Sequence, residues 1–277
     1  REVRMSYFTV DETKCRRDGY CAAVCPRALI IQTGDDFPLP VDEGAELCIR
    51  CGHCVAVCPH EAMVLKSFGP EACRHVEPEK KLTADQAEHF LRCRRSIRVY
   101  KDRTVEREVL TRLIETARYA PSGHNLQPVR WLVIESPAEV NRLAGMVIDW
   151  MRTLTVTQPD IAAYWRFDRI IAAWELGKDM VLRGAPHLIC AHAPAELLPA
   201  RNAAVIALTY MELAATSMGL GTCWAGYFTA ASVAYPPLPA ALGLPGGHEC
   251  FGAVMVGYPK LRYSRMPPRN YPEITWR

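Results

Sequence analysis

The order of apolar and polar positions predicts alternating helices and strands along the later part of the chain. Thr83 is suited to cap a helix over residues 84–93, because its hydroxyl can accept a hydrogen bond from an amide of the first turn. A second helix is predicted over 105–119. Its apolar face consists of Val109, Leu110, Leu113, Ile114 and Ala117.

Three short apolar, β-branched runs predict strands at 131–135, 187–191 and 250–257. The stretch 201–218 between the last two is helical and apolar nearly all round, and such helices must be buried. Helices alternating with well-separated strands indicate an α+β or α/β sandwich rather than a bundle. The glycines at 219, 221 and 226 do not fit G-x-G-x-x-G, so a Rossmann dinucleotide site is not supported.

Composition separates this region from the beginning of the chain. Residues 69–81 are polar and rich in Pro, Glu and Lys, which predicts a connection between domains at 1–80 and 81–277; the 277 residues leave room for two domains. Lys and Arg number 33 against 30 Asp and Glu, a net charge of +3, which gives no case for a nucleic-acid partner. The longest apolar stretch, 203–211, is too short to span a bilayer.

Cysteines near the beginning of the chain supply the first chemical signal. Cys48, Cys51, Cys54 and Cys58, followed by Pro59, have the C-x2-C-x2-C-x3-C-P spacing with which bacterial-type ferredoxins hold cubane iron–sulfur clusters. An earlier run, Cys15, Cys21 and Cys25 before Pro26, keeps the same frame but has Asp18 in place of the second cysteine. The duplication predicts a small ferredoxin-like domain with two clusters.

In the two-cluster pattern, the fourth cysteine of each run binds the cluster of the other run. One [4Fe–4S] cluster is then predicted on Cys25, Cys48, Cys51 and Cys54, and a second on Cys15, Asp18, Cys21 and Cys58. A carboxylate holds soft iron less firmly than a thiolate does. The second cluster is therefore expected either as [4Fe–4S] with Asp18 as a ligand or as a site that readily becomes [3Fe–4S].

Structural zinc and a disulfide framework are the alternatives for these cysteines. Zinc sites do not need four close cysteines in each of two runs with a following proline. The charged opening residues do not resemble an export signal, and twelve cysteines without one indicate a reducing, cytoplasmic location. Cys73 and His75 fit no metal-ligand spacing and are interpreted as ordinary surface groups.

Four motifs in the second region together resemble the FMN-dependent nitroreductase family. They are Arg94-Arg95-Ser96-Ile97-Arg98-Val99-Tyr100, Ala120-Pro121-Ser122-Gly123-His124-Asn125-Leu126-Gln127-Pro128, Gly219-Leu220-Gly221-Thr222-Cys223-Trp224-Ala225-Gly226, and Val256-Gly257-Tyr258-Pro259. Their order matches the family over residues 83–277. The resemblance implies a dimeric, nitroreductase-like α/β sandwich behind the ferredoxin-like domain, which makes the whole chain α+β.

The resemblance also implies which residues hold FMN. Arginines suit the phosphate dianion because the planar guanidinium meets its oxygens bidentately. By resemblance, further ligands of the same phosphate come from the tail, where Tyr263 replaces a lysine of relatives. The backbone amides of Ala225 and Gly226 are expected to face the ring, which they would tune through hydrogen bonds. The full set is Arg94, Arg95, Ser96, Arg98, Pro121, Ser122, Gly123, Asn125, Gln127, Cys223, Trp224, Ala225, Gly226, Arg262 and Arg265. Alternatively, the first arginines form a solvated face and 121–125 is only a turn.

In this family two chains build each flavin site, so a homodimer is expected. The helix 201–218 is then either the interface helix or a core helix. Aromatic residues in 146–174, including Trp165, correspond to the region that covers the flavin, where they either stack on a planar acceptor or pack helices. Beside the flavin itself, His124 and Trp165 are the candidate catalytic side chains, and His124 is alternatively a plain loop residue.

The two halves together predict an iron–sulfur flavoprotein oxidoreductase. Ferredoxin-type clusters carry single electrons at potentials on the order of −400 mV, whereas organic acceptors usually take electron pairs, and a flavin connects these modes. Electrons are expected to pass from reduced ferredoxin or another donor protein through the clusters to FMN, and then to a nitroaromatic, quinone or conjugated acceptor. NAD(P)H is the alternative donor. A dehydrogenase that exports electrons through the clusters and a non-catalytic redox relay or sensor stay open.

Overall fold

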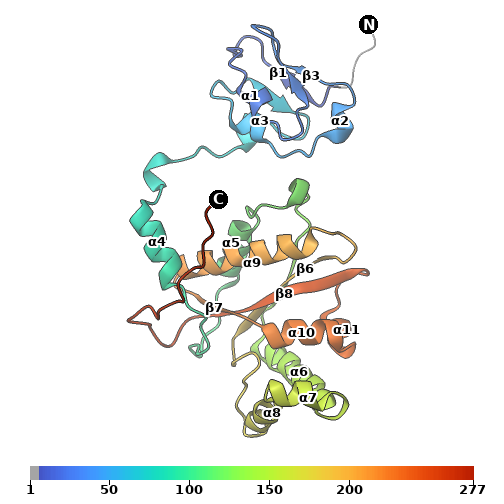
Figure 1. The fold of residues 1–277 in the computed structure, drawn as a ribbon, viewed down its shortest axis with the longest axis vertical. Coiled ribbons are helices and arrows are strands. Elements are labelled where there is room, and N and C mark those ends of the chain that lie inside the picture. The colour runs from blue at the N-terminus through green and yellow to red at the C-terminus, as the bar shows by residue number, and fades with distance from the viewer. Residues whose placement is uncertain (1–5) are drawn as a thin grey trace. The chain divides into compact units, whose positions relative to one another are not determined.

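The computed structural model describes residues 6–277, which form two compact units (Figure 1). The first contains residues 6–81 together with His124–Leu126. The second contains Leu82–Gly123 and Gln127–Arg277. The polar stretch predicted as a connection holds two short 3₁₀ turns, η1 (Pro70–Ala72) and η2 (Pro78–Lys80).

The first unit is built from short elements around a small core. Its elements are β1 (Phe8–Val10), α1 (Tyr20–Ala23), β2 (Ile30–Ile31), β3 (Leu39–Pro40), α2 (Gly44–Leu47), α3 (His53–Ala56) and β4 (Met63–Leu65). Strand β1 pairs antiparallel with β4, and β2 pairs antiparallel with β3. Buried apolar side chains of this core, such as Phe8 and Met63, lie in one cluster with Cys21 and Cys54. The thiols are therefore part of the core.

The duplicated cysteine runs fold as a structural repeat. Helices α1 and α3 each follow a glycine, Gly19 and Gly52, that has φ of 76°. Glycine adopts this left-handed conformation without the steric cost that a Cβ atom adds. After each run, a backbone amide donates to the last thiol: Leu29 to Sγ of Cys25 at 3.3 Å, and Ala62 to Sγ of Cys58 at 3.4 Å. The two halves thus present their ligands in the same local geometry.

A four-stranded antiparallel sheet in the order β5-β6-β8-β7 forms the centre of the second unit. Its strands are β5 (Arg130–Ile134), β6 (His187–Pro194), β7 (Gly221–Trp224) and β8 (His248–Gly257). The helices are α4 (Ala84–Cys93), α5 (Arg107–Ala117), α6 (Pro137–Thr157), α7 (Pro159–Tyr164), α8 (Phe167–Glu175), α9 (Ala200–Ser217), α10 (Gly226–Ala234) and α11 (Pro237–Leu242). The 3₁₀ turn η3 (Gly123–Asn125) has Gly123 in this unit and its other two residues in the first. The long central strands β6 and β8 are buried on both faces.

Alternation along the central strands divides the core into two layers. On β6, Leu188 and Cys190 face the cluster that contains α6 and α10, whereas Ile189 and Ala191 face the cluster that contains α5 and α9. Successive side chains of a strand point to opposite faces, so each helical layer covers one face. Figure 1 shows α5 and α9 on one side of these strands and α6, α10 and α11 on the other. The result is the predicted sandwich.

The elements predicted for the second unit are confirmed with small shifts at their ends, but its strand β7 was not predicted. Thr83 and Gln86 form a capping box at α4, with bonds of 3.0 and 3.3 Å. The third motif, residues 219–226, contains β7, which pairs with β8 from Gly221↔Gly257 to Trp224↔Val254. None of the helices described for residues 6–277 has the length and apolar character needed to cross a membrane.

Leu188→Ala is expected to destabilise the protein, because this fully buried side chain near the start of β6 packs in the core layer that contains α6 and α10. Such a truncation leaves a cavity and lowers the free energy of unfolding by about 2–5 kcal/mol. Leu198→Ala is the matched control, because Leu198 is 95% exposed, and a shift within about 0.5 kcal/mol is expected. Denaturant unfolding followed by circular dichroism measures both; equal losses would contradict the layer assignment.

Candidate functional site

The four thiols predicted to hold one cluster line a single cavity of the first unit. They are Cys25, Cys48, Cys51 and Cys54. Burial, together with the neighbouring thiols Cys51, Cys25 and Cys48, raises the pKa of the Cys54 thiol to about 11. Such a thiol binds as a thiolate only where a metal compensates its charge. The donor set therefore fits iron that carries positive charge.

The second predicted ligand set lines a separate cavity. Cys15, Asp18, Cys21 and Cys58 border it together with His60. The Asp18 carboxylate accepts a bond of 3.2 Å from the amide of Tyr20, and its other oxygen lies 4.0 Å from Nε2 of His60. The structure thus places Asp18 among the three thiols of its predicted cluster. Among residues 6–277, no three His, Cys, Asp or Glu side chains are placed to hold a single metal ion.

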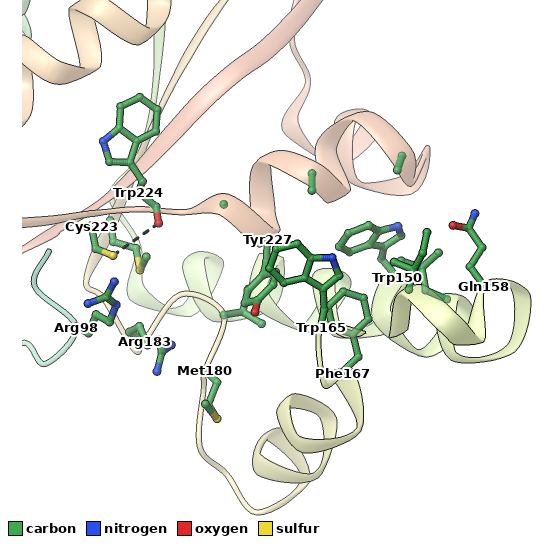
Figure 2. A pocket seen from close by; sticks show the side chains of 17 residues that line it. Arg98, Trp150, Gln158, Trp165, Phe167, Met180, Arg183, Cys223, Trp224 and Tyr227 are labelled. Atoms are coloured by element: carbon green, nitrogen blue, oxygen red, sulfur yellow. Dashed lines mark hydrogen bonds between the residues drawn. The ribbon is translucent and has the colours of Figure 1, made fainter. Parts of the chain in front are cut away.

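A cavity of about 700 Å³ lies in the second unit between β7, α6–α8 and α10 (Figure 2). Arg98 and Arg183 lie at one end, close to Cys223. The other end is aromatic, with Trp150, Trp165, Phe167 and Tyr227 in its wall. Phe167 packs edge-on against Tyr227, with ring centroids 6.0 Å apart. One cavity thus combines a cationic end with an aromatic one.

The cationic end has no carboxylate of its own. Arg98 donates a weak bond of 3.4 Å to the carbonyl of Ser96, and no carboxylate in residues 6–277 pairs with Arg98 or Arg183. Burial raises the pKa of the Cys223 thiol, although both arginines act in the opposite direction. Cys223 is therefore a neutral wall residue at pH 7, and the two guanidinium groups are available to an anionic or electron-rich ligand.

The two residues after β7 differ in what their amides bind. The amide of Ala225 donates to the carbonyl of Ala253 at 2.9 Å, so it is bonded within the sheet rather than facing the cavity as expected. Gly226 lines the cavity and begins α10. The first amides of a helix have no partner within that helix. Gly226 is therefore the remaining candidate for an amide beside the ring.

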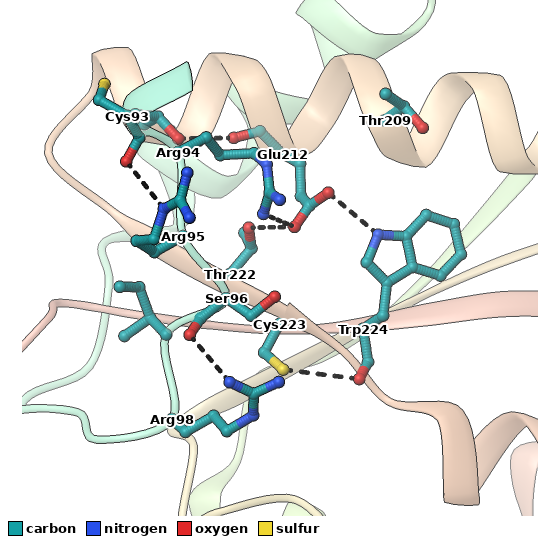
Figure 3. A network of polar contacts seen from close by, with 12 residues as sticks. Cys93, Arg94, Arg95, Ser96, Arg98, Thr209, Glu212, Thr222, Cys223 and Trp224 are labelled. Atoms are coloured by element: carbon teal, nitrogen blue, oxygen red, sulfur yellow. Dashed lines mark hydrogen bonds and ion pairs between the residues drawn. The ribbon is translucent and has the colours of Figure 1, made fainter. Parts of the chain in front are cut away.

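The predicted phosphate residues lie on the segment that leads to the cavity (Figure 3). Arg94 forms an ion pair of 3.0 Å with Glu212 of α9. Arg95 donates to the carbonyls of Cys93, at 3.4 Å, and Arg92. The amide of Ile97 donates to the carbonyl of Thr222 at 2.8 Å. This bond ties the segment to β7.

Other predicted flavin residues line a different cavity of about 350 Å³ in the same unit. Pro121, Ser122 and Gln127 border it beside Trp131 and Ala203, and the amide of Gln127 donates to the hydroxyl of Ser122 at 2.9 Å. One chain thus presents two separate groups of the predicted flavin residues.

Three residues of the second motif, residues 120–128, have strained backbone. The turn η3 contains Gly123, His124 and Asn125. His124, Asn125 and Gln127 have φ of 53°, 53° and 46°. Left-handed backbone at residues other than glycine is costly and often lies at ligand sites. The tail residues Arg262 and Arg265 are exposed after β8 and stay predictions.

Met180, Arg183 and Tyr227 are among the residues of the larger cavity that sequence reasoning missed. Arg183 lies in the loop before β6 and has φ of 62°, a conformation that its sequence neighbourhood does not indicate. Tyr227 directly follows Gly226, the last residue of the third motif, so the motif could have indicated it. The predicted Trp165 does line the cavity, 54% exposed.

Comparison with known proteins assigns both regions. The nitroreductase family model matches residues 73–258, and a 4Fe-4S dicluster domain model matches residues 8–87. A predicted NADH dehydrogenase/NAD(P)H nitroreductase from Archaeoglobus fulgidus is 25% identical over 170 residues, which cover 60% of this chain and 82% of that relative.

Solved structures show the same fold for the second unit. A nitroreductase with bound FMN from Bacteroides fragilis has a TM-score of 0.55 and 20% identity, over 69% of this chain and 99% of its own. A nitroreductase with bound FMN from Desulfitobacterium hafniense has a TM-score of 0.55 and 23% identity, over 70% and 99%. The chain therefore belongs to the nitroreductase family and carries a 4Fe-4S dicluster domain ahead of the family's own domain.

Proposed function

We propose that the protein is an FMN-dependent oxidoreductase that receives single electrons at two iron–sulfur clusters and delivers electrons to a planar aromatic or conjugated acceptor. The observation that carries this proposal is the joint occurrence, in one chain, of two cavities lined by the predicted cluster ligands and a third with a cationic and an aromatic end. Bound FMN in the similar nitroreductase structures supports the cofactor.

Each end of the large cavity has a separate task in this proposal. Arg98 and Arg183 would hold the electron-rich edge of the flavin ring, while Arg94, Arg95 and Ser96 bind its phosphate. The flavin, when bound, supplies exchange between one-electron and two-electron transfer. The aromatic residues at the other end exclude water and stack on the acceptor. Nitroaromatics, quinones and enones share the flat shape that this wall fits.

A homodimer would unite the two groups of flavin residues. The cavity at Ser122 and the cavity at Arg98 are separate in one chain, and a second copy can bring the first group of one chain to the second group of the other. Helix α9 supports this arrangement because Val205, Ile206 and Tyr210 are 37–40% exposed on it. Apolar groups exposed together on one element are typical of interfaces.

Anaerobic stopped-flow mixing tests the direction of electron flow. Reduced ferredoxin is expected to bleach the cluster absorbance first and the flavin absorbance afterwards, because single electrons enter at the clusters. NADH and NADPH, mixed separately, are expected to reduce the flavin more slowly. Fast flavin reduction by a nicotinamide with silent clusters would contradict the proposal. Saturable turnover of a nitroaromatic or quinone separates an enzyme from an electron relay.

Cys51→Ser is expected to remove one cluster and about half of the bound iron, because Cys51 is one of the four thiols of its cavity. Cys73→Ser is the matched control. Cys73 lies outside both ligand sets and its thiol donates to the carbonyl of Gly69 at 3.8 Å. Iron and sulfide analysis of anaerobically purified protein measures both. Equal iron loss in the two variants would overturn the ligand assignment.

Asp18→Cys tests whether the carboxylate binds iron. A fourth thiolate holds the corner iron more firmly than a carboxylate does, so mild oxidation is expected to produce a [3Fe–4S] signal in the natural protein but not in the variant. Electron paramagnetic resonance before and after ferricyanide treatment measures this difference. Identical spectra for the two proteins would remove Asp18 from the ligand set.

A further inference from the structure

A buried carboxylate, Glu212, joins the predicted phosphate-binding segment to the strand that borders the large cavity (Figure 3). Glu212 lies on α9 and is 6% exposed. Its Oε1 is 3.0 Å from Nη1 of Arg94, and its Oε2 accepts a bond of 3.0 Å from Nε1 of Trp224. The Thr222 hydroxyl donates a longer bond of 3.4 Å to Oε1. One carboxylate thus binds both segments.

The arrangement places the cation in front of the carboxylate. The side chain of Arg94 is 26% exposed, whereas that of Glu212 is 7% exposed. A guanidinium has five N–H donors, and only Nη1 is used by Glu212. The other donors remain for an anion that approaches from the open side. A carboxylate behind a binding group fixes the orientation of that group, as outer-shell partners do for metal ligands.

The second bond of Glu212 fixes the end of β7. Trp224 is the last residue of β7 and directly precedes Ala225 and Gly226. The register of β7 with β8 places Cys223 toward the cavity-side core and Trp224 toward α9. The indole therefore anchors the strand from the side opposite the cavity. Any displacement of Trp224 also displaces the chain that enters the cavity wall at Gly226.

We propose that Glu212 is a positioning residue that couples binding of the FMN phosphate at Arg94 to the placement of β7 and Gly226 beside the flavin ring. This inference rests on the proposed function, because it requires that FMN binds in the second unit. A phosphate that orders Arg94 also orders Glu212, and through it Trp224. Because such coupling is reciprocal, the packing of Trp224 in turn strengthens phosphate binding.

Glu212→Gln provides the direct test, because it removes the charge and keeps the size of the side chain. We expect FMN to bind about tenfold more weakly to the apoprotein and the flavin midpoint potential to shift, while circular dichroism stays unchanged. Flavin fluorescence titration and anaerobic dye-coupled reduction measure the two quantities. Glu249→Gln is the matched control, since Glu249 is an exposed carboxylate on β8, and both quantities should equal those of the natural protein.

A double-mutant cycle tests the coupling itself. Arg94→Lys and Trp224→Phe are made singly and together, and the FMN dissociation constant is measured for each. If Glu212 connects the two residues, their effects are non-additive by about threefold or more, and this excess disappears in the Glu212→Gln background. Trp224→Phe leaves the Arg94–Glu212 ion pair intact, so the cycle in the natural background decides the question even where the glutamine variant does not fold.

The outcomes separate this inference from the function on which it rests. A natural protein that binds no FMN overturns the proposed function and, with it, the role of Glu212. A natural protein that binds FMN, combined with unchanged affinity and potential in Glu212→Gln, or with an additive cycle, overturns the positioning role alone. A purely structural role predicts lower stability with an additive cycle, so it is also distinguished.

Discussion

The pairing of β7 with the edge of β8 is the constraint on which the geometry of the flavin region depends. The register Thr222↔Val256 and Trp224↔Val254 puts alternate side chains on opposite faces of the sheet. Trp224 meets Glu212 on one face, while Cys223 meets the arginines of the cavity on the other. A shift of the β7–β8 register by one residue would exchange these faces. The same strand-pairing hydrogen bonds therefore position both the cavity wall at Cys223 and the buried contact between Trp224 and Glu212.

The first unit depends in a similar way on its thiols, but here metal binding rather than side-chain packing is the constraint. Its core is small, and Cys21 and Cys54 are buried within it. Small cores contribute little stability by themselves, and metal binding to cysteines contributes directly to folding. The repeated glycine turns and amide-to-thiol bonds at Cys25 and Cys58 show that the backbone is arranged to present sulfur, which accounts for a unit with so few long elements.

Features that local chemistry determines were predicted best from the sequence. The cysteine spacing indicated two ligand sets because cluster ligation demands it, and the capping residue Thr83 indicated where α4 begins. Features that depend on contacts between segments distant in the sequence were predicted less well. Strand β7 has only four residues and begins with Gly221. Its sequence pattern is therefore typical of a loop, and only the pairing with β8 makes it a strand. Arg183 enters the cavity through a left-handed backbone with φ of 62°. Glu212 interrupts an apolar helix, a visible signal, but its partners lie on segments whose proximity no local pattern reveals.

The contrast between the two ends of the large cavity bears on acceptor choice under the proposed function. Specific rejection of related substrates requires buried polar groups that are left unpaired by the wrong molecule. At the aromatic end, the wall is formed by Trp150, Trp165, Phe167 and Tyr227, whose large faces recognise flatness and area more than particular substituents. The charged groups, Arg98 and Arg183, lie at the end assigned to the flavin. Discrimination among acceptors would therefore come mainly from shape and from electron affinity, which favours a range of planar molecules over a single one.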